Sequence, residues 1–123
     1  MYEVSSSRKG GRGLFATEPI DKDVLLMQAP LLIVPGEQRA ALEATLVDEY
    51  VYEWDEDASA ALVLGVSSLC NHDPEPNAFL WLFEDEVYAE LWTLRPIEPG
   101  EEITVSYRAV GEDTPLWFDV ITD

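Results

Sequence analysis

The chain has 123 residues, of which 47% are hydrophobic and 26% are charged. This length favours one domain over residues 1–123, and the apolar content excludes a disordered acidic tail. The formal charge of −18, from 25 acidic and 7 basic side chains, disfavours direct nucleic-acid binding and favours a basic polypeptide partner. A solvated acidic surface adapted to high salt is an equally good explanation of this charge.

The lengths of the apolar runs and the number of cysteines also limit the class of protein. No apolar run approaches the roughly 20 residues that cross a bilayer, and Met1–Ser5 contains no apolar signal region. A soluble protein, cytoplasmic by default, is therefore expected. Cys70 is the only cysteine, which excludes a disulfide within the chain and a cysteine-rich zinc site. Because Cys70 follows an apolar stretch, a buried and inert thiol is favoured over a nucleophile.

The first 34 residues are predicted to form strands and turns. Lys9–Gly13 is a flexible loop, because glycine accepts backbone angles that other residues avoid. Apolar runs at 24–27 and 31–34 predict two buried strands. The break between them is placed at Ala29-Pro30, because proline cannot donate a hydrogen bond to a sheet.

One helix is predicted, from Glu37 to about Tyr50. Leu42, Leu46 and Tyr50 recur four residues apart, which is typical of the apolar face of a helix. Residues 58–69 are apolar and rich in small side chains. Periodicity alone leaves a short helix and a buried strand both open for that segment.

Two β-prone runs, Ala78–Phe83 and Val87–Leu94, flank the acidic turn Glu84–Glu86 and predict a hairpin. A last strand is predicted at Glu102–Tyr107, after the loop Arg95–Gly100. The fold class is therefore mostly β, with many short strands and one helix.

Three separated motifs stand in one order along the chain. They are Gly11-Arg12-Gly13-Leu14-Phe15-Ala16-Thr17, Cys70-Asn71-His72-Asp73-Pro74-Glu75-Pro76-Asn77, and Glu101-Glu102-Ile103-Thr104-Val105-Ser106-Tyr107. Over about residues 9–107 this set resembles the SET domain, the fold of many protein-lysine methyltransferases. The resemblance implies several small curved sheets of the β-clip type, a knot-like threading of the C-terminal segment, and a flap-like tail at 108–123. The chain departs from the family at Asp73, where serine is usual.

The resemblance implies S-adenosylmethionine as the methyl donor. By that analogy, the backbone of Arg12, Gly13 and Leu14 approaches the methionine part of the donor, where a Cβ at the glycine would block contact. The Asn71 side chain accepts a hydrogen bond from the donor's ammonium group, and the His72 backbone pairs with the adenine edge. No metal is expected, since the chain has one histidine and one cysteine. Without the other two motifs, the Asn71 block would be interpreted as a structural turn.

Tyr107 is the predicted catalytic residue. An attacking lysine amine must be neutral although its free pKa is ~10.4, and a narrow apolar channel disfavours the ammonium form. The Tyr107 hydroxyl would help to hold the methyl group in line, and a core tyrosine at a strand end is the alternative. Tyr50 resembles a lysine-channel residue of the shortest SET domains, with Tyr52 as the alternative and a plain helix-face role for Tyr50 equally open. Many family members carry Phe or Tyr two positions before the catalytic tyrosine, where the residue limits the number of methyl groups added. This chain departs from that pattern with the small Val105, which leaves the number open.

The tail contains Trp117 and Phe118, which are predicted to cover the adenine and the substrate by stacking. A disordered tail is the alternative. Small stand-alone members of the family include dimers, and the hairpin face that carries Phe79, Trp81 and Phe83 is a candidate homodimer interface.

The predicted function is transfer of a methyl group from S-adenosylmethionine to the ε-amine of lysine in a basic or histone-like protein. A chromatin-like substrate would imply a nuclear or nucleoid location instead of the cytoplasm. The alternative is a non-catalytic SET-type module that binds basic peptides, which the departures at Asp73 and Val105 motivate. A third possibility is an unrelated acidic β-scaffold.

Overall fold

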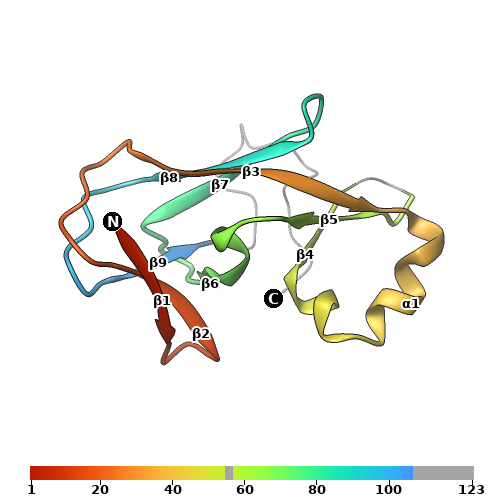
Figure 1. Ribbon diagram of the computed structural model, residues 1–123, viewed down its shortest axis with the longest axis horizontal. Coiled ribbons are helices and arrows are strands. Elements are labelled where there is room, and N and C mark those ends of the chain that lie inside the picture. The colour runs from red at the N-terminus through yellow and green to blue at the C-terminus, as the bar shows by residue number, and fades with distance from the viewer. Residues whose placement is uncertain (55–56, 107–123) are drawn as a thin grey trace.

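The computed structural model describes residues 1–54 and 57–106, and strands dominate these residues, as predicted (Figure 1). The strands form two sheets in this part of the chain, with the orders β1-β2-β9-β6 and β4-β5-β3-β8-β7. The first sheet consists of β1 (Tyr2–Ser6), β2 (Arg12–Ala16), β6 (Asn71–His72) and β9 (Glu102–Val105). The second consists of β3 (Leu25–Val34), β4 (Val51–Glu53), β5 (Ala60–Val63), β7 (Ala78–Phe83) and β8 (Tyr88–Thr93). The predicted knot-like threading depends on C-terminal residues that lie outside the described part.

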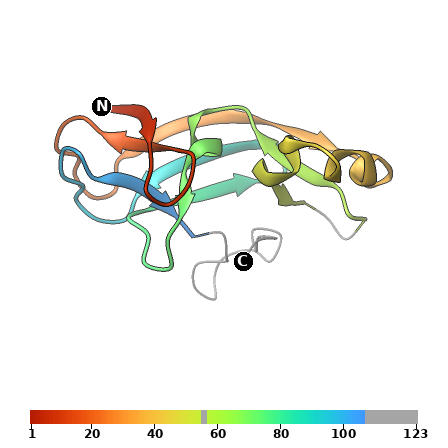
Figure 2. The same ribbon diagram turned by 90° about the horizontal axis from the view of Figure 1, so that it is seen from below.

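The two sheets share one apolar core. Leu14 from β2 and Ile103 from β9 are fully buried and belong to the same cluster as Leu80 from β7 and Leu91 from β8. The β1–β2 hairpin lies at one end of the molecule and the helical segment 36–50 at the other, with β3 running between them (Figure 2). The glycine loop (Lys9–Gly13) nevertheless lies near the end of the helical segment, because Gly10 and Gly11 line a cavity together with Glu49 and Tyr50.

The β7–β8 hairpin has the predicted alternation of buried and half-buried residues. Its inward face buries Ala78, Leu80, Leu82, Ala89, Leu91 and Thr93. Its outward face carries a row of rings, in which Phe83 and Tyr88 stack with centroids 4.6 Å apart and Phe79 meets Trp81 edge-on at 6.3 Å. Period-two alternation between a core and a solvated face is sufficient to specify such a hairpin.

The two strands predicted around Pro30 are one continuous strand, β3, so the predicted break is wrong. Leu25–Pro30 pairs with β8, whereas Leu31–Val34 pairs with β5 on the opposite edge. Pro30 stands where the partner changes. The neighbouring Leu31 N–H donates to the carbonyl of Val87, at 3.0 Å. A missing N–H is tolerated at this point, because the ladder with β8 is ending there.

The predicted helix over 37–50 is also corrected. A 3₁₀ turn at Gly36–Gln38 leads into a short α1 at Arg39–Glu43, and a second 3₁₀ turn follows at Leu46–Tyr50. Thr45 breaks the helix, because its backbone is extended (ψ 164°) and its hydroxyl donates to the carbonyl of Leu42, at 2.7 Å. Leu46 is 67% exposed, so the apolar face inferred from periodicity buries too little to sustain a longer helix.

The apolar segment 58–69 contains both of the structures left open for it. Ala60–Val63 forms β5, which is buried between β4 and β3, and Val66–Leu69 forms a 3₁₀ turn. Cys70 and then β6 directly follow this turn. Gly65 lies between the strand and the turn, at the N-cap of the turn, where a Cβ would collide with Met27 and Ala29 of β3.

Candidate functional site

The second and third sequence motifs meet through β6 and β9. These two strands are parallel, with Asn71 opposite Thr104 and His72 opposite Val105. The N–H of Asp73 then donates to the carbonyl of Val105, at 3.0 Å. The Asn71 block therefore lies beside the last strand as far as Val105. Tyr107, the predicted catalytic residue, lies just outside the described residues.

Asn77, at the C-terminal end of the Asn71 block, binds the backbone of β9 with its side chain. Its side chain is 1% exposed. Its Oδ1 accepts from the N–H of Thr104, at 2.8 Å, and its Nδ2 donates to the carbonyl of Glu102, at 2.7 Å. An asparagine suits this position because it offers a donor and an acceptor on one short side chain.

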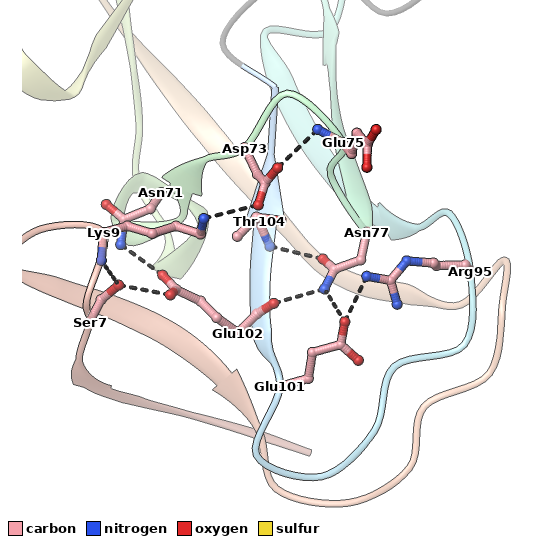
Figure 3. Close-up of polar contacts among 10 residues, drawn as sticks. All are labelled: Ser7, Lys9, Asn71, Asp73, Glu75, Asn77, Arg95, Glu101, Glu102 and Thr104. Carbon is pink, nitrogen blue, oxygen red and sulfur yellow. Dashed lines mark hydrogen bonds and ion pairs between the residues drawn. The ribbon is translucent and has the colours of Figure 1, made fainter.

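Glu102 connects the glycine loop to Asn71 (Figure 3). One carboxylate oxygen accepts from the Ser7 hydroxyl at 2.7 Å, and the other accepts from Nδ2 of Asn71 at 2.7 Å. The same Nδ2 donates to the carbonyl of Arg12, at 3.0 Å. Because both neighbours of Nδ2 are acceptors, the amide orientation is determined, and Oδ1 of Asn71 takes part in neither bond.

Gly13 leaves room for this network. A Cβ at this position would collide with the Glu102 carboxylate and would lie 3.1 Å from Nδ2 of Asn71. The sequence argument attributed the glycine to close approach of a methyl donor. The structure adds a reason within the chain itself, since the clash is with side chains of the site.

A cavity of about 470 Å³ lies beside this network. Three residues that the sequence singled out, Arg12, Tyr50 and Asn71, line it together. The complete lining is Gly10, Gly11, Arg12, Glu49, Tyr50, Ser68, Leu69, Cys70 and Asn71. Elements far apart in the sequence thus form one concave surface of a size typical for small-ligand sites.

The other predicted site residues have different surroundings. Leu14 is fully buried in the core, so only its backbone remains available for the predicted contact. His72 is half-buried in β6. Tyr52, the alternative to Tyr50, is 7% exposed and belongs to the core. Trp117, predicted to stack on the adenine, lies outside the described residues.

Cys70 is the inert thiol that the sequence predicted. It is 1% exposed, and burial followed by the nearby Glu102 carboxylate raises its pKa to about 12. A thiol with this pKa carries almost no thiolate at neutral pH and is a poor nucleophile. Within the described residues, no group of three histidine, cysteine or acidic side chains is placed to hold a metal ion.

Sequence reasoning did not assign roles to Ser7, Lys9 or Glu102. The contacts of Ser7 with Glu102 and of Lys9 with Asp73 join segments that are far apart in the chain, so no local pattern marks them. Sequence position gave a signal for two of these residues, since Glu102 belongs to the third motif and Lys9 begins the glycine loop, but it did not show their partners. Separately, none of the described helices is long and apolar enough to cross a membrane.

Comparison with known proteins is consistent with this geometry. The model of the SET domain family matches residues 11–108. A histone-lysine N-methyltransferase of Schizosaccharomyces pombe, specific for lysine 37 of histone H3, is 34% identical over 118 residues, which cover 95% of this chain and 76% of that protein. A SET and MYND domain-containing protein of Dictyostelium discoideum is 46% identical over 48 residues, covering 39% of this chain and 14% of that protein.

A solved structure shares the fold. The crystal structure of a Plasmodium falciparum protein, described as a candidate histone methyltransferase, superposes with a TM-score of 0.67 and 24% identity, and covers 90% of this chain and all of that one. The family match extends over most of the sequence and includes the three motifs. In the described residues, the first and second motifs both pair with the strand of the third, through β2 and β6. The chain therefore belongs to the SET domain family.

Proposed function

We propose that this protein uses S-adenosylmethionine to methylate the ε-amine of lysine in a basic protein. Membership of the SET domain family, together with 34% identity over most of the chain to a histone-lysine methyltransferase, supports the class of protein-lysine N-methyltransferases. The observation that carries the proposal is the cavity in which the glycine loop, Asn71 and Tyr50 come together. These segments are the ones expected to hold the donor and to approach the lysine.

The residues present fit the donor. When bound, S-adenosylmethionine supplies a methyl group on a positively charged sulfur. Oδ1 of Asn71 is the oxygen that the fixed amide can offer to an ammonium group, because both neighbours of Nδ2 are acceptors. Gly10 and Gly11 leave open space where a Cβ would stand, so a ligand can approach their backbone closely. We expect the backbone of Arg12, Gly13 and Leu14 and that of His72 to complete this contact.

The substrate is proposed to be basic because the protein is strongly acidic. The net charge of −18 attracts cationic polypeptides, and Glu49 adds a carboxylate to the cavity wall next to Tyr50. A lysine amine must lose its proton before it attacks, which an apolar channel favours by desolvation. Tyr107 and Trp117 keep their predicted roles, at the methyl group and over the adenine. Because the location follows the substrate, we propose a cytoplasmic protein, or a nuclear or nucleoid one if the substrate is chromatin.

Transfer of a labelled methyl group from S-adenosylmethionine to a histone mixture tests this function. We expect labelled lysine with the wild type. The Tyr107→Phe variant should lose at least about a hundredfold in turnover with little change in donor affinity, if its hydroxyl acts at the transition state. Asn71→Ala should instead weaken donor binding by about tenfold, because one charge-assisted hydrogen bond is lost.

The same assay separates the alternative functions. Donor binding without label transfer to any basic protein would remove the enzymatic claim. Peptide binding that is indifferent to the donor, measured by calorimetry, would favour the non-catalytic module. Absence of any rise in melting temperature with donor would remove the claim that the protein binds S-adenosylmethionine, because a ligand that binds the folded state stabilises it.

We also propose a homodimer through the outward face of the β7–β8 hairpin. The aromatic row on that face is half-buried, and Leu32 of the same sheet is 51% exposed. Two copies that each carry −18 repel one another, and salt screens that repulsion. Sedimentation equilibrium should therefore show more dimer at 1 M salt than at 0.1 M, and Trp81→Glu should abolish it. A monomer under all these conditions would contradict the dimer without affecting the proposed reaction.

A further inference from the structure

One ion pair joins the glycine loop to the Asn71 block beside the cavity. Nζ of Lys9 lies 2.9 Å from Oδ2 of Asp73 (Figure 3). Lys9 immediately precedes Gly10, which lines the cavity, and Asp73 follows two residues after Asn71, which also lines it. The side chains are 38% and 29% exposed, so the pair lies at the surface but is not fully solvated.

Both partners of the ion pair lie in segments that are fixed by further hydrogen bonds. The N–H of Lys9 donates to the Ser7 hydroxyl at 3.0 Å, and that hydroxyl donates to Glu102 at 2.7 Å. On the other side, Oδ1 of Asp73 accepts from the N–H of Glu75, at 2.9 Å. The ion pair therefore joins two anchored segments, and less side-chain entropy is lost than when two free surface chains pair.

The glycine loop between these anchors has little packing of its own. Gly10 and Gly11 have φ angles of +139° and +51°, and nothing lies within 4 Å of a Cβ built on either residue. Backbone hydrogen bonds from the Ser7 N–H to the Gly11 carbonyl and from the Gly10 N–H to the Ser7 carbonyl close the turn. The position of the turn against the rest of the protein depends on polar contacts, because apolar burial contributes little to it. Releasing one end should widen the range of positions that the cavity wall explores.

We propose that Lys9 and Asp73 are positioning residues, which together latch the glycine loop against the Asn71 block and preorganise the cavity for its ligand. The identity of that ligand as the methyl donor rests on the proposed function. The ordering of the glycine loop by this ion pair does not rest on the proposed function, because the pair is formed in the protein without a ligand. The Glu75 N–H first, and then Lys9, lower the pKa of Asp73, so the latch stays charged at neutral pH.

Two other roles for the ion pair predict different changes in donor affinity when one partner is replaced. If the two charges acted only through their field, Lys9→Met would tighten the binding of positively charged S-adenosylmethionine and Asp73→Asn would weaken it. If Lys9 bound the donor directly, Lys9→Met would weaken binding while Asp73→Asn would not. A latch predicts that both single variants weaken binding to a similar extent. It also predicts that the charge swap, Lys9→Asp with Asp73→Lys, restores much of the loss.

The experiment measures dissociation constants by calorimetry for S-adenosylmethionine and for its demethylated product, which lacks the sulfonium charge. The single variants should bind both ligands about two- to fivefold more weakly than the wild type, the range expected for a surface ion pair. At 1 M salt, where the Debye length is about 3 Å, the difference should largely disappear. Equal affinity in wild type and variants, or opposite effects of the two single variants, would overturn the latch.

Matched controls and a measurement without ligand complete the test. Lys22→Met and Asp85→Asn make the same charge changes at exposed positions away from the cavity, and should leave both affinities unchanged. In the protein alone, hydrogen exchange at the Gly10 and Gly11 amides should be faster in each single variant and close to wild type in the swap. If the wild type binds no donor, the proposed function fails, and the exchange rates still decide whether the latch exists.

Discussion

The β7–β8 hairpin and the β6–β9 junction are both strand pairs, but they owe their order to different interactions. The hairpin joins two six-residue strands that are neighbours in sequence and buries one continuous apolar face. The junction pairs the two-residue β6 with β9 in parallel. It is held by the side-chain amides of Asn71 and Asn77. A strand of two residues cannot specify its partner by hydrophobic pattern, so individual polar side chains must do so.

The hairpin should respond most strongly to loss of buried volume. Leu80 is 1% exposed, and Leu80→Ala removes its transfer free energy and leaves a cavity, which should cost about 3 kcal/mol of unfolding free energy. Chemical denaturation measures this loss. Leu32→Ala makes the same change at a residue that is 51% exposed, and should cost well under 1 kcal/mol. Equal costs at the two positions would contradict the assignment of the core.

The junction should respond to loss of single hydrogen bonds. Asn77→Ala leaves the N–H of Thr104 and the carbonyl of Glu102 without the partners they now have, which should cost about 2 kcal/mol. Asn71→Ala is the matched change at a half-buried site, and should lower stability less while affecting donor binding more. If Asn77→Ala were neutral in denaturation and Asn71→Ala were not, the division between a structural and a ligand-binding asparagine would be wrong.

Lowering the pH should reduce the contribution of one carboxylate in each region to the unfolding free energy, and this effect should be smaller than those of the two substitutions above. In the hairpin, Gln28 and then Trp92 donate hydrogen bonds that lower the pKa of Glu90. At the junction, burial alone would raise the pKa of Glu101, but hydrogen bonds from Arg95, the Glu98 N–H and Asn77 outweigh it and lower the pKa. Because folding lowers both pKa values, each carboxylate stabilises the protein fully above its ordinary pKa of about 4.3. This contribution is lost as the pH falls through the folded value.

The pH dependence is measured as unfolding free energy between pH 7 and pH 3. Protonation of many acidic groups also relieves repulsion in a chain of charge −18, which acts in the opposite direction. The informative quantity is therefore the difference between the wild type and Glu90→Gln or Glu101→Gln. That difference should shrink on acidification, and a constant difference would contradict the lowered pKa values.

Much of the fold was predictable where neighbouring residues cooperate. The alternation in β7 and β8 and the β-prone run before Tyr107 predicted strands, because a two-residue period reports burial directly. Periodicity failed at Leu46, where the apolar spacing is helical but the tertiary structure offers no surface to cover it. It also failed at Pro30, because the change of partner along β3 is not encoded near the proline.

The candidate site was predictable only as a set of motifs. Arg12, Tyr50 and Asn71 could be named from the sequence, and the structure brings them to one cavity. The role of Glu102, which orients the Asn71 amide, and the bridge from Lys9 to Asp73 could not be predicted. Each depends on angstrom-level distances between segments that are remote in the chain, and residue order carries no direct record of such distances.

The sequence by itself determined the fold class, the family and the order of the three motifs, since these depend on local pattern and residue identity. Only the tertiary structure decided which atoms of those motifs meet. The amide of Asn71 is oriented by Arg12 and Glu102, and the glycine loop and Asn71 line one cavity. The physical reason is that side-chain hydrogen bonds and ion pairs act over about 3 Å, so they form only after the packed sheets have brought distant segments together.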